Sequence, residues 1–244
     1  MNDLFSLAGK TILVTGASSG IGKNIAILSS QMGANVIITA RRENNLRETI
    51  SEMPGEGHKY IVADLSKQND IDSLVENLPR LDGIVHCAGV GSRQLCKQIT
   101  REEVVRVFEA NFIAPVMLQK AILEKKKINK GASIVFLSSR GASAPAIANS
   151  VYSASKSAIA SFAHCLALEL APRGIRVNCI SPAMVWTDLI VRDGLDKETL
   201  AENEKTYPLG RYGKPEDISP LAIYLLSDCS SWMTTSDIKI SGGN

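Results

Sequence analysis

Short runs rich in β-branched residues recur along the chain at spacings that leave room for a helix between neighbouring runs. The runs are Thr11–Thr15, Asn35–Thr39, Tyr60–Ala63, Gly83–His86, Ser133–Leu137, Arg176–Ile180 and Asp237–Ile240. They are apolar throughout rather than alternating, which is typical of parallel strands buried on both faces. The intervening segments predict helices, for example Ile21–Met32, Arg101–Ile122, Ser153–Ala171 and Pro215–Ser227. We therefore expect an α/β fold, a single doubly wound Rossmann-type parallel sheet with helices on both faces.

The length of 244 residues allows one large domain or two small ones. No linker rich in Pro, Gly or Ser divides the chain and no internal repeat is visible, so we expect a single domain over residues 1–244. The least patterned stretch, residues 188–212, is polar and charged. A segment of this length between a strand and a helix predicts a lid that covers a substrate, and a surface insertion with a short helix is the alternative.

Composition excludes several classes of function. A net charge of +2 and an aromatic content of 5% argue against a nucleic-acid partner. No apolar run approaches the roughly 20 residues that span a bilayer, and none near the start suits a signal peptide. Five cysteines without a Cys-x-x-Cys motif and three scattered histidines predict free thiols, a reducing compartment and no metal site. We expect a cytoplasmic protein that binds neither membrane nor metal.

A glycine-rich turn follows the first expected strand directly and leads into a helix. Glycine permits a tight turn and close approach of a phosphate, and a helix N-terminus offers unpaired N–H groups to an anion. The spacing G-x-x-x-G-x-G is neither the usual dinucleotide fingerprint nor a Walker A loop, so an ordinary strand–helix turn is the alternative. The position in a βαβ unit favours a dinucleotide-phosphate site at Gly16, Ser18, Ser19, Gly20, Ile21 and Gly22.

The end of the second expected strand indicates which dinucleotide is bound. Folds of this kind place an acid there to bind the ribose of NAD, whereas a nearby arginine accommodates the 2′-phosphate of NADP. This chain has Ala40 where the acid would lie, followed by Arg41 and Arg42. Because guanidinium groups pair well with phosphate, the cofactor is predicted to be NADP(H).

Tyr152 and Lys156 are four residues apart on an expected helix, which places both side chains on one face. An ammonium close to a phenol favours the phenolate and lowers a pKa that starts near 10. A tyrosine tuned in this way can exchange a proton with a carbonyl or an alcohol. By itself the Tyr-x-x-x-Lys pattern is common, and a half-buried tyrosine beside a surface lysine is the alternative.

Together with the glycine turn, this pair resembles the short-chain dehydrogenase/reductase family over essentially the whole chain. The resemblance implies that Tyr152, Lys156, a serine thirteen residues before the tyrosine (Ser139) and Asn111 in the long preceding helix are the catalytic residues. The segment from Asn178 to Thr187 is similar to the part of the family that flanks the nicotinamide. In length and motif style the chain is most similar to β-ketoacyl-[acyl-carrier-protein] reductases.

The resemblance also implies a mechanism and further cofactor contacts. NADPH delivers a hydride to a substrate carbonyl, Ser139 stabilises the developing alkoxide, and Tyr152 gives the proton. Lys156 binds the nicotinamide ribose and forms a proton relay with Asn111. The other residues expected to contact the dinucleotide are Asp64, Leu65, Cys87, Ala88, Gly89, Pro182, Val185 and Thr187.

Three positions depart from the family pattern. The family's Asn-Asn-Ala-Gly is His86-Cys87-Ala88-Gly89 here, its Pro-Gly is Pro182-Ala183, and a C-terminal Thr-Gly is Thr234-Thr235. We expect His86 to be a hydrogen-bonded structural residue and Cys87 not to be a nucleophile.

A basic run, Lys125 to Lys127, is predicted to cap the C-terminus of a helix, where cations suit the dipole. The sharper alternative is that this run, with Lys130 and Arg173, docks an acidic acyl carrier protein.

The leading hypothesis is an NADPH-dependent oxidoreductase that reduces a carbonyl to a secondary alcohol, like a 3-oxoacyl-[acyl-carrier-protein] reductase. The substrate is a small carbonyl or alcohol compound, free or bound to an acyl carrier protein. An NAD(P)-dependent dehydrogenase of a small alcohol, sugar or polyol is the alternative enzyme, and a catalytically silent dinucleotide-binding sensor or scaffold is the alternative without turnover. The resemblance implies a homotetramer, or a homodimer, formed through helices Arg101–Ile122 and Ser153–Ala171.

Overall fold

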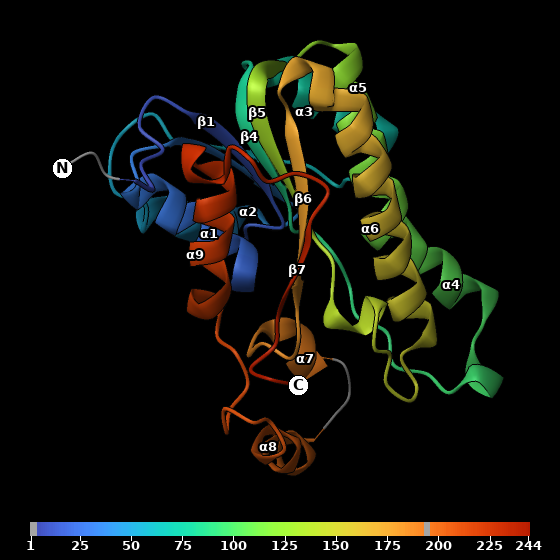
Figure 1. Ribbon diagram of the computed structural model, residues 1–244. Coiled ribbons are helices and arrows are strands. Elements are labelled where there is room, and N and C mark those ends of the chain that lie inside the picture. Colours follow the sequence, from blue (N-terminus) through green and yellow to red (C-terminus); the bar gives the residue numbers. More distant parts are fainter. Residues whose placement is uncertain (1–3, 193–195) are drawn as a thin grey trace.

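The computed structural model describes residues 4–192 and 196–244. All seven strands of its sheet run parallel, in the order β3-β2-β1-β4-β5-β6-β7 (Figure 1). The strands are β1 Thr11–Thr15, β2 Asn35–Ala40, β3 Lys59–Val62, β4 Leu81–His86, β5 Ile128–Leu137, β6 Arg176–Pro182 and β7 Asp237–Ile240. The predicted doubly wound α/β fold is therefore confirmed.

Helices cover both faces of the sheet (Figure 1). The α-helices are α1 Gly20–Gln31, α2 Glu43–Ser51, α3 Gln68–Asn77, α4 Arg101–Phe108, α5 Ala114–Glu124, α6 Ser150–Leu170, α7 Asp188–Arg192, α8 Lys197–Lys205 and α9 Pro215–Leu226. Short 3₁₀ turns lie at Cys96–Gln98, Arg140–Ala142, Ala171–Arg173 and Asp228–Ser230. One layer contains α1, α2 and α9, and the other contains α3, α5 and α6.

Strand β1 shows why the strands carry apolar residues at every position. Ile12 and Val14 pack into the core beneath α1 and α9, whereas Leu13 between them packs into the core beneath α3, α5 and α6. All three side chains are fully buried. Because successive residues of a strand point to opposite faces, burial on both faces requires an unbroken apolar run.

The order of the strands reverses between β1 and β4. The connection that follows β1 crosses one face of the sheet, and the connection that follows β4 crosses the other face. A crevice therefore opens between the carboxyl ends of these two strands, and ligands bind there in folds of this type. Helices α7 and α8 lie at the same edge of the sheet, close to the C-terminus (Figure 1).

The single helix predicted over residues 101–122 is interrupted. Between α4 and α5 lies one π-helical turn, Glu109–Ile113. Pro115 is the local cause, because it has no N–H to donate to the carbonyl of Asn111, and its ring crowds that carbonyl. The chain widens there and turns the Asn111 side chain into the protein, where it is 2% exposed.

One residue of the basic run, Lys127, caps the C-terminus of a helix, as predicted for the run. Lys127 Nζ donates to the carbonyls of Glu76 and Leu78, at distances of 3.1 and 2.6 Å. These carbonyls lie at the C-terminus of α3, so Lys127 joins the end of α5 to α3 and interacts favourably with the dipole of α3.

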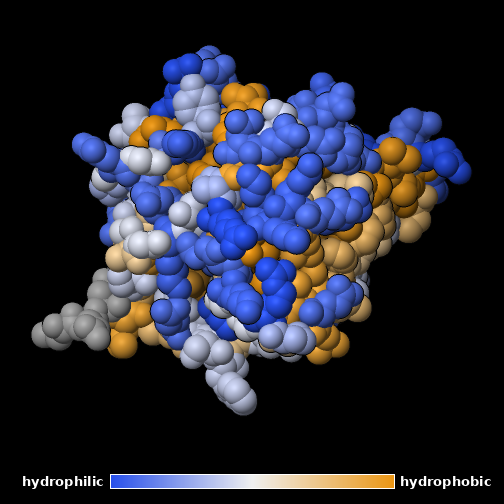
Figure 2. All heavy atoms as spheres, turned by 90° about the horizontal axis from the view of Figure 1, so that it is seen from above, coloured by the Kyte–Doolittle hydropathy of each residue, from blue (hydrophilic) through white to orange (hydrophobic). Residues whose placement is uncertain are grey.

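No helix within residues 4–192 and 196–244 is long and apolar enough to cross a membrane. Seen from the edge of the sheet opposite α7 and α8, most of the surface is hydrophilic, and hydrophobic residues gather toward the side of α5 and α6 (Figure 2). The exposed hydrophobic residues of α4, the π turn and α6 are Val105, Ile113 and Leu168.

Candidate active site

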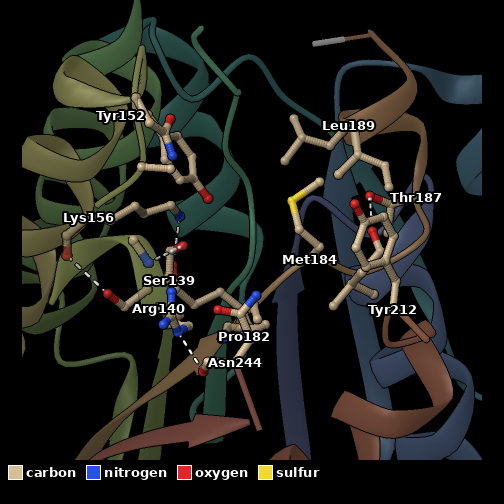
Figure 3. A pocket seen from close by; sticks show the side chains of 18 of the residues that line it. Ser139, Arg140, Tyr152, Lys156, Pro182, Met184, Thr187, Leu189, Tyr212 and Asn244 are labelled. Atoms are coloured by element: carbon tan, nitrogen blue, oxygen red, sulfur yellow. Dashed lines mark hydrogen bonds between the residues drawn. The ribbon is translucent and has the colours of Figure 1, made fainter. Parts of the chain in front are cut away.

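Two connected hollows lie at the carboxyl edge of the sheet. The first, here called the cavity, has a volume of about 390 Å³ (Figure 3). The second, here called the channel, has a volume of about 900 Å³ and runs along the glycine turn and the end of β2. The residues that line both hollows are Ile21, Cys87, Gly89, Val90, Arg93, Thr187 and Leu189. Cavity and channel are therefore parts of one groove.

The glycine turn forms one wall of the channel, and its main chain fits closely against neighbouring backbone. Gly16 has φ of +67°, and a Cβ added there would lie 2.7 Å from Ala88 Cα. A Cβ on Gly22 would lie 2.6 Å from the Gly16 carbonyl oxygen. Side chains larger than hydrogen do not fit at either position, so the turn presents bare backbone to the channel.

The N-terminus of α1, which follows this turn, carries no acidic residue in its first turn, and its N-cap residue Ser19 makes no side-chain capping bond. Its N–H groups are left to face the channel and suit an anion. The hydroxyls of Ser18 and Ser19 instead each accept a hydrogen bond of 3.1 Å from Arg42 Nη2. Arg42 thus joins the glycine turn to the end of β2.

Arg41 and Asp64 face each other across the far end of the channel, after strands β2 and β3. Partial burial by itself raises the pKa of Asp64, but hydrogen bonds from Ser66 and the charge of Arg41 bring it below its ordinary value. Asp64 Oδ1 accepts from the amide and the hydroxyl of Ser66 at 3.2 and 2.8 Å. Arg41, Arg42, Asp64 and Leu65 all line the channel, as do Ala88 and the predicted residues of the glycine turn.

Thr15, at the end of β1, holds the loop after β4 in place. Its Oγ1 accepts hydrogen bonds from the amides of Cys87 and Ala88, at 3.0 and 3.2 Å. This role was not predicted, because a threonine at the end of a strand has no distinctive pattern. Burial raises the pKa of the Cys87 thiol to about 12, so this thiol is protonated at neutral pH and is no nucleophile, as expected.

His86 is a structural residue, as expected. Its ring stacks on Phe136 with centroids 4.4 Å apart, and Nε2 lies 3.0 Å from Gln119 Oε1. Burial lowers its pKa to about 4, so the ring is neutral at neutral pH.

The π turn directs Asn111 toward the loop after β4. Its Oδ1 accepts from the amide of Val90 at 2.8 Å, and its Nδ2 donates to the Val90 carbonyl and to Ser155 Oγ. A Cβ on Gly89 would lie 3.0 Å from Asn111 Oδ1 and 3.5 Å from Lys156 Nζ. Asn111 and Lys156 therefore both lie beside Gly89, and Asn111 itself lines neither the cavity nor the channel.

Tyr152, Lys156 and Ser139 line the cavity together (Figure 3). The ammonium of Lys156 lies 5.8 Å from the centre of the Tyr152 ring and donates to the Leu137 carbonyl at 2.7 Å. Burial lowers the pKa of Lys156 to about 8, which keeps most of its charge at neutral pH. Ser139 Oγ accepts from the amide of Gly141 at 3.1 Å, so its own proton is free for another acceptor.

The opposite wall of the cavity follows strand β6. Pro182, Val185 and Thr187 line it, and Thr187 Oγ1 donates to the Val185 carbonyl at 3.3 Å. A Cβ on Gly20 would lie 3.0 Å from Thr187 Cγ2, so this wall also touches the glycine turn.

The stretch 188–212 contains the short helices α7 and α8, and residues 193–195 of it lie outside the described residues. Glu204 fastens α8 to the body of the protein, since its Oε1 accepts from Trp186 Nε1 and from the amide of Tyr212, both at 2.9 Å. Tyr207, Tyr212 and Leu189 line the cavity from this segment. A carboxylate that accepts hydrogen bonds from an indole and a backbone amide leaves no pattern in the sequence, so the role of Glu204 was not predicted.

Two further cavity residues, Arg93 and Arg140, are cations that were not predicted to lie at the site. Arg140 directly follows Ser139, and that adjacency is a signal present in the sequence. Among the described residues, no group of three His, Cys, Asp or Glu side chains is placed to hold a metal ion.

Comparison with known proteins agrees with this geometry. The profile of the family described as "Enoyl-(Acyl carrier protein) reductase" matches residues 16–244. The human protein "Dehydrogenase/reductase SDR family member 4" is 32% identical over 97% of this chain and 88% of its own length. The chain belongs to the short-chain dehydrogenase/reductase family.

Two other similarities show how wide this family is. The "3-oxoacyl-[acyl-carrier-protein] reductase FabG" of Rickettsia felis is 32% identical over 98% of both chains. The crystal structure of "Short-chain dehydrogenase/reductase SDR:Glucose/ribitol dehydrogenase from Brucella melitensis" superposes with a TM-score of 0.91, at 30% identity over 98% of both chains. Members of the family are oxidoreductases that act on CH–OH groups of small molecules and use nicotinamide dinucleotides, and they often oligomerise.

Proposed function

We propose that this protein is an NADPH-dependent reductase that converts a carbonyl to a secondary alcohol, of the 3-oxoacyl-[acyl-carrier-protein] reductase type, and that residues 1–244 form one domain. The observation that carries the proposal is the meeting of Ser139, Tyr152 and Lys156 in one cavity that continues into the channel. A proton donor, a cation and a hydroxyl on one side of a groove suit the reduction of a polarised carbonyl.

The channel fits a dinucleotide because bare backbone, open N–H groups and arginines lie together along its wall at the glycine turn and the end of β2. The glycine turn would hold the pyrophosphate, Asp64 and Leu65 the adenine, and the loop 87–89 the adenine-side ribose. Lys156, Pro182, Val185 and Thr187 would hold the nicotinamide end. The bound dinucleotide supplies the hydride that reduces the carbonyl carbon.

The side chains of the cavity manage the proton and the developing charge. Ser139 donates its free hydroxyl proton to the substrate oxygen, and Tyr152 gives its phenolic proton to the same oxygen. Lys156 stabilises the phenolate that remains, because its charge lies next to the ring. Asn111 and Lys156 both lie beside Gly89, and water molecules held between them would return a proton to Tyr152.

The preference for NADP(H) rests on the end of β2. Arg41 and Arg42 both line the channel, and no acid takes the place of Ala40. A guanidinium forms an ion pair with the 2′-phosphate of NADP. NAD carries an uncharged hydroxyl at the same ribose position, so it cannot form this ion pair.

The segment 188–212 serves as the lid in this proposal. It contributes Leu189, Tyr207 and Tyr212 to the cavity wall, and Glu204 holds it at one point. A lid of this kind keeps water from the reacting carbonyl.

The exposed Val105, Ile113 and Leu168 support assembly into a homotetramer, or a homodimer, through the helices that bear them. The elution volume and light scattering of the purified protein would give the number of subunits. Free thiols at all five cysteines support a cytoplasmic location.

A dehydrogenase of small alcohols, sugars or polyols is the second candidate. The cavity contains amide and hydroxyl side chains suited to a polyhydroxylated ligand, namely Asn149, Asn203 and Thr206. The similar Brucella protein is described as a glucose/ribitol dehydrogenase. A silent dinucleotide sensor is disfavoured because all four expected catalytic residues are present and three of them line the cavity.

Oxidation of NADPH, followed at 340 nm, tests the proposal with a panel of β-ketoacyl thioesters, simple ketones and ketoses. Parallel assays with NADP and secondary alcohols or polyols test the second candidate. We expect the fastest turnover with a β-ketoacyl thioester and NADPH. Binding of NADPH without oxidation by any carbonyl would leave the sensor as the better description.

A further inference from the structure

The cavity carries an unbalanced positive charge. The charged side chains that line it are Arg93, Arg140 and Lys156, and among the described residues no Asp or Glu side chain lines it; the main-chain carboxylate of Asn244 is its one negative group. The channel differs, because Asp64, Glu103, Glu109 and Asp188 line it together with its arginines. A hollow in which three cations face one carboxylate keeps a positive excess and attracts a further anion.

Arg140 stands beside the expected oxyanion site. It follows Ser139 directly, and its Nε donates to a main-chain carboxylate oxygen of Asn244 at 2.6 Å (Figure 3). This single bond fixes the side chain at the cavity wall and leaves four of its five N–H groups without a protein acceptor among the described residues.

Arg93 approaches the cavity from the loop after β4. No salt bridge or hydrogen bond of the described residues engages its guanidinium, although it lines the groove. The charge of Arg93 acts on Tyr212 at the opposite wall of the cavity. Burial raises the pKa of Tyr212, and the positive charge of Arg93 partly opposes that rise. Two guanidinium groups thus face the space in which the proposed substrate reacts.

We propose that the carbonyl substrate is an anion, which carries a carboxylate or a phosphate group that Arg93 and Arg140 bind. This inference rests on the proposed reductase activity and narrows its substrate class. The fork of an arginine matches both oxyanions in a bidentate way, and such charge-assisted bonds are the strong ones in partly dry sites. Lys156 is engaged by the Leu137 carbonyl and by its place beside Tyr152, so the two arginines remain for recognition.

Matched pairs of substrates test this proposal. Acetoacetate is compared with methyl acetoacetate, and dihydroxyacetone phosphate with dihydroxyacetone, by kcat/KM for NADPH oxidation. The first pair reports on a carboxylate and the second on a phosphate. We expect the charged member of at least one pair to be preferred at least about tenfold.

Variants assign the preference to residues. Arg93→Gln and Arg140→Gln should each lower the ratio of charged to neutral substrate about tenfold, and Arg140→Lys should lower it less. The ratio is taken within one variant, so general damage to folding cancels. Arg101→Gln is the matched control, because Arg101 is exposed at the start of α4 and lines neither hollow.

The outcomes separate the two proposals. If methyl acetoacetate and dihydroxyacetone are reduced as well as their charged partners, or if both arginine variants keep the ratio, the anionic substrate is wrong and the reductase stands. If Arg93→Gln raises only the KM for NADPH, Arg93 binds the dinucleotide and not the substrate, and the proposed role of Arg93 is wrong. If no carbonyl oxidises NADPH, the reductase itself falls, and the anionic substrate with it.

Discussion

The channel and the cavity share the Thr187 wall, yet they are built from different parts of the chain and different kinds of group. The channel is shaped largely by main chain, where a Cβ would overlap neighbouring backbone at Gly16 and Gly22 and crowd the Thr187 side chain at Gly20. The cavity is shaped by side chains from strand ends, α6 and the 188–212 segment. Backbone shape is encoded within a few residues, so it tolerates little change, whereas a cavity walled by side chains changes its ligand by single substitutions.

The largest effect is expected in the cavity, at Tyr152. In Tyr152→Phe the ring remains and the phenolic proton is lost, so kcat for carbonyl reduction should fall about 10³-fold. The affinity for NADPH, measured by fluorescence titration, should change little. A variant with near-normal kcat would show that another group delivers the proton.

In the channel the main chain itself is the target. Gly16→Ala combines a left-handed conformation with overlap of Ala88, at a cost of about 3 kcal/mol in the free energy of unfolding. The melting temperature should fall by about 10 °C and NADPH should bind more than tenfold more weakly. Gly131→Ala is the control, because φ is +75° there and nothing lies within 4 Å. Equal losses in both variants would mean that close packing at the turn is unimportant.

Substitution of the arginines at the end of β2 tests whether side chains determine which dinucleotide the channel binds. Arg41→Asp removes a phosphate partner and restores an acid near the position that NAD-binding folds use. The ratio of kcat/KM for NADPH to that for NADH should fall about tenfold to a hundredfold. An unchanged ratio would assign the 2′-phosphate to Arg42, and Arg42→Ala would then be the informative variant.

The smallest effect concerns His86, which lies on β4 where channel and cavity meet. The folded chain keeps this ring neutral down to about pH 4, whereas the unfolded chain protonates it below about 6.5. The unfolded state then binds more protons, so stability falls as the pH falls through this window. In His86→Asn this loss, about 1 kcal/mol between pH 6 and 5, should disappear from urea unfolding curves. If the free energy of unfolding of the variant fell as steeply between pH 6 and 5, other titratable groups would be responsible for the loss of stability in acid.

The same contrast explains what the sequence could and could not predict. Strands Thr11–Thr15 and Asp237–Ile240 have the predicted bounds, because a β-branched run in the first and the alternation of charged residues with isoleucine in the second are local properties. Strand β5 begins at Ile128, five residues before the prediction, since polar Asn129 and Lys130 hide its start. The glycine turn was also visible, because its conformation needs residues without a Cβ.

The cavity could be predicted only in part. Ser139, Tyr152 and Lys156 follow from spacing and resemblance, and the structure brings them to one wall. Arg93 and Tyr207 reach the cavity wall through tertiary contacts, and the carboxylate of Glu204 finds its partners Trp186 and Tyr212 on the two flanks of α8. No local pattern encodes such contacts.

The π turn at Glu109–Ile113 means that the α4–α5 rod contains one residue more than a regular helix of its length. Each residue of an α-helix advances the side-chain direction by about 100°. Deleting one residue in this turn would restore regular pitch but rotate the buried Leu118 and Ile122 of α5 away from the core. The surplus residue therefore acts as a spacer that sets the phase of α5, and a homologue that lost it would need a compensating shift in the loop that follows α5.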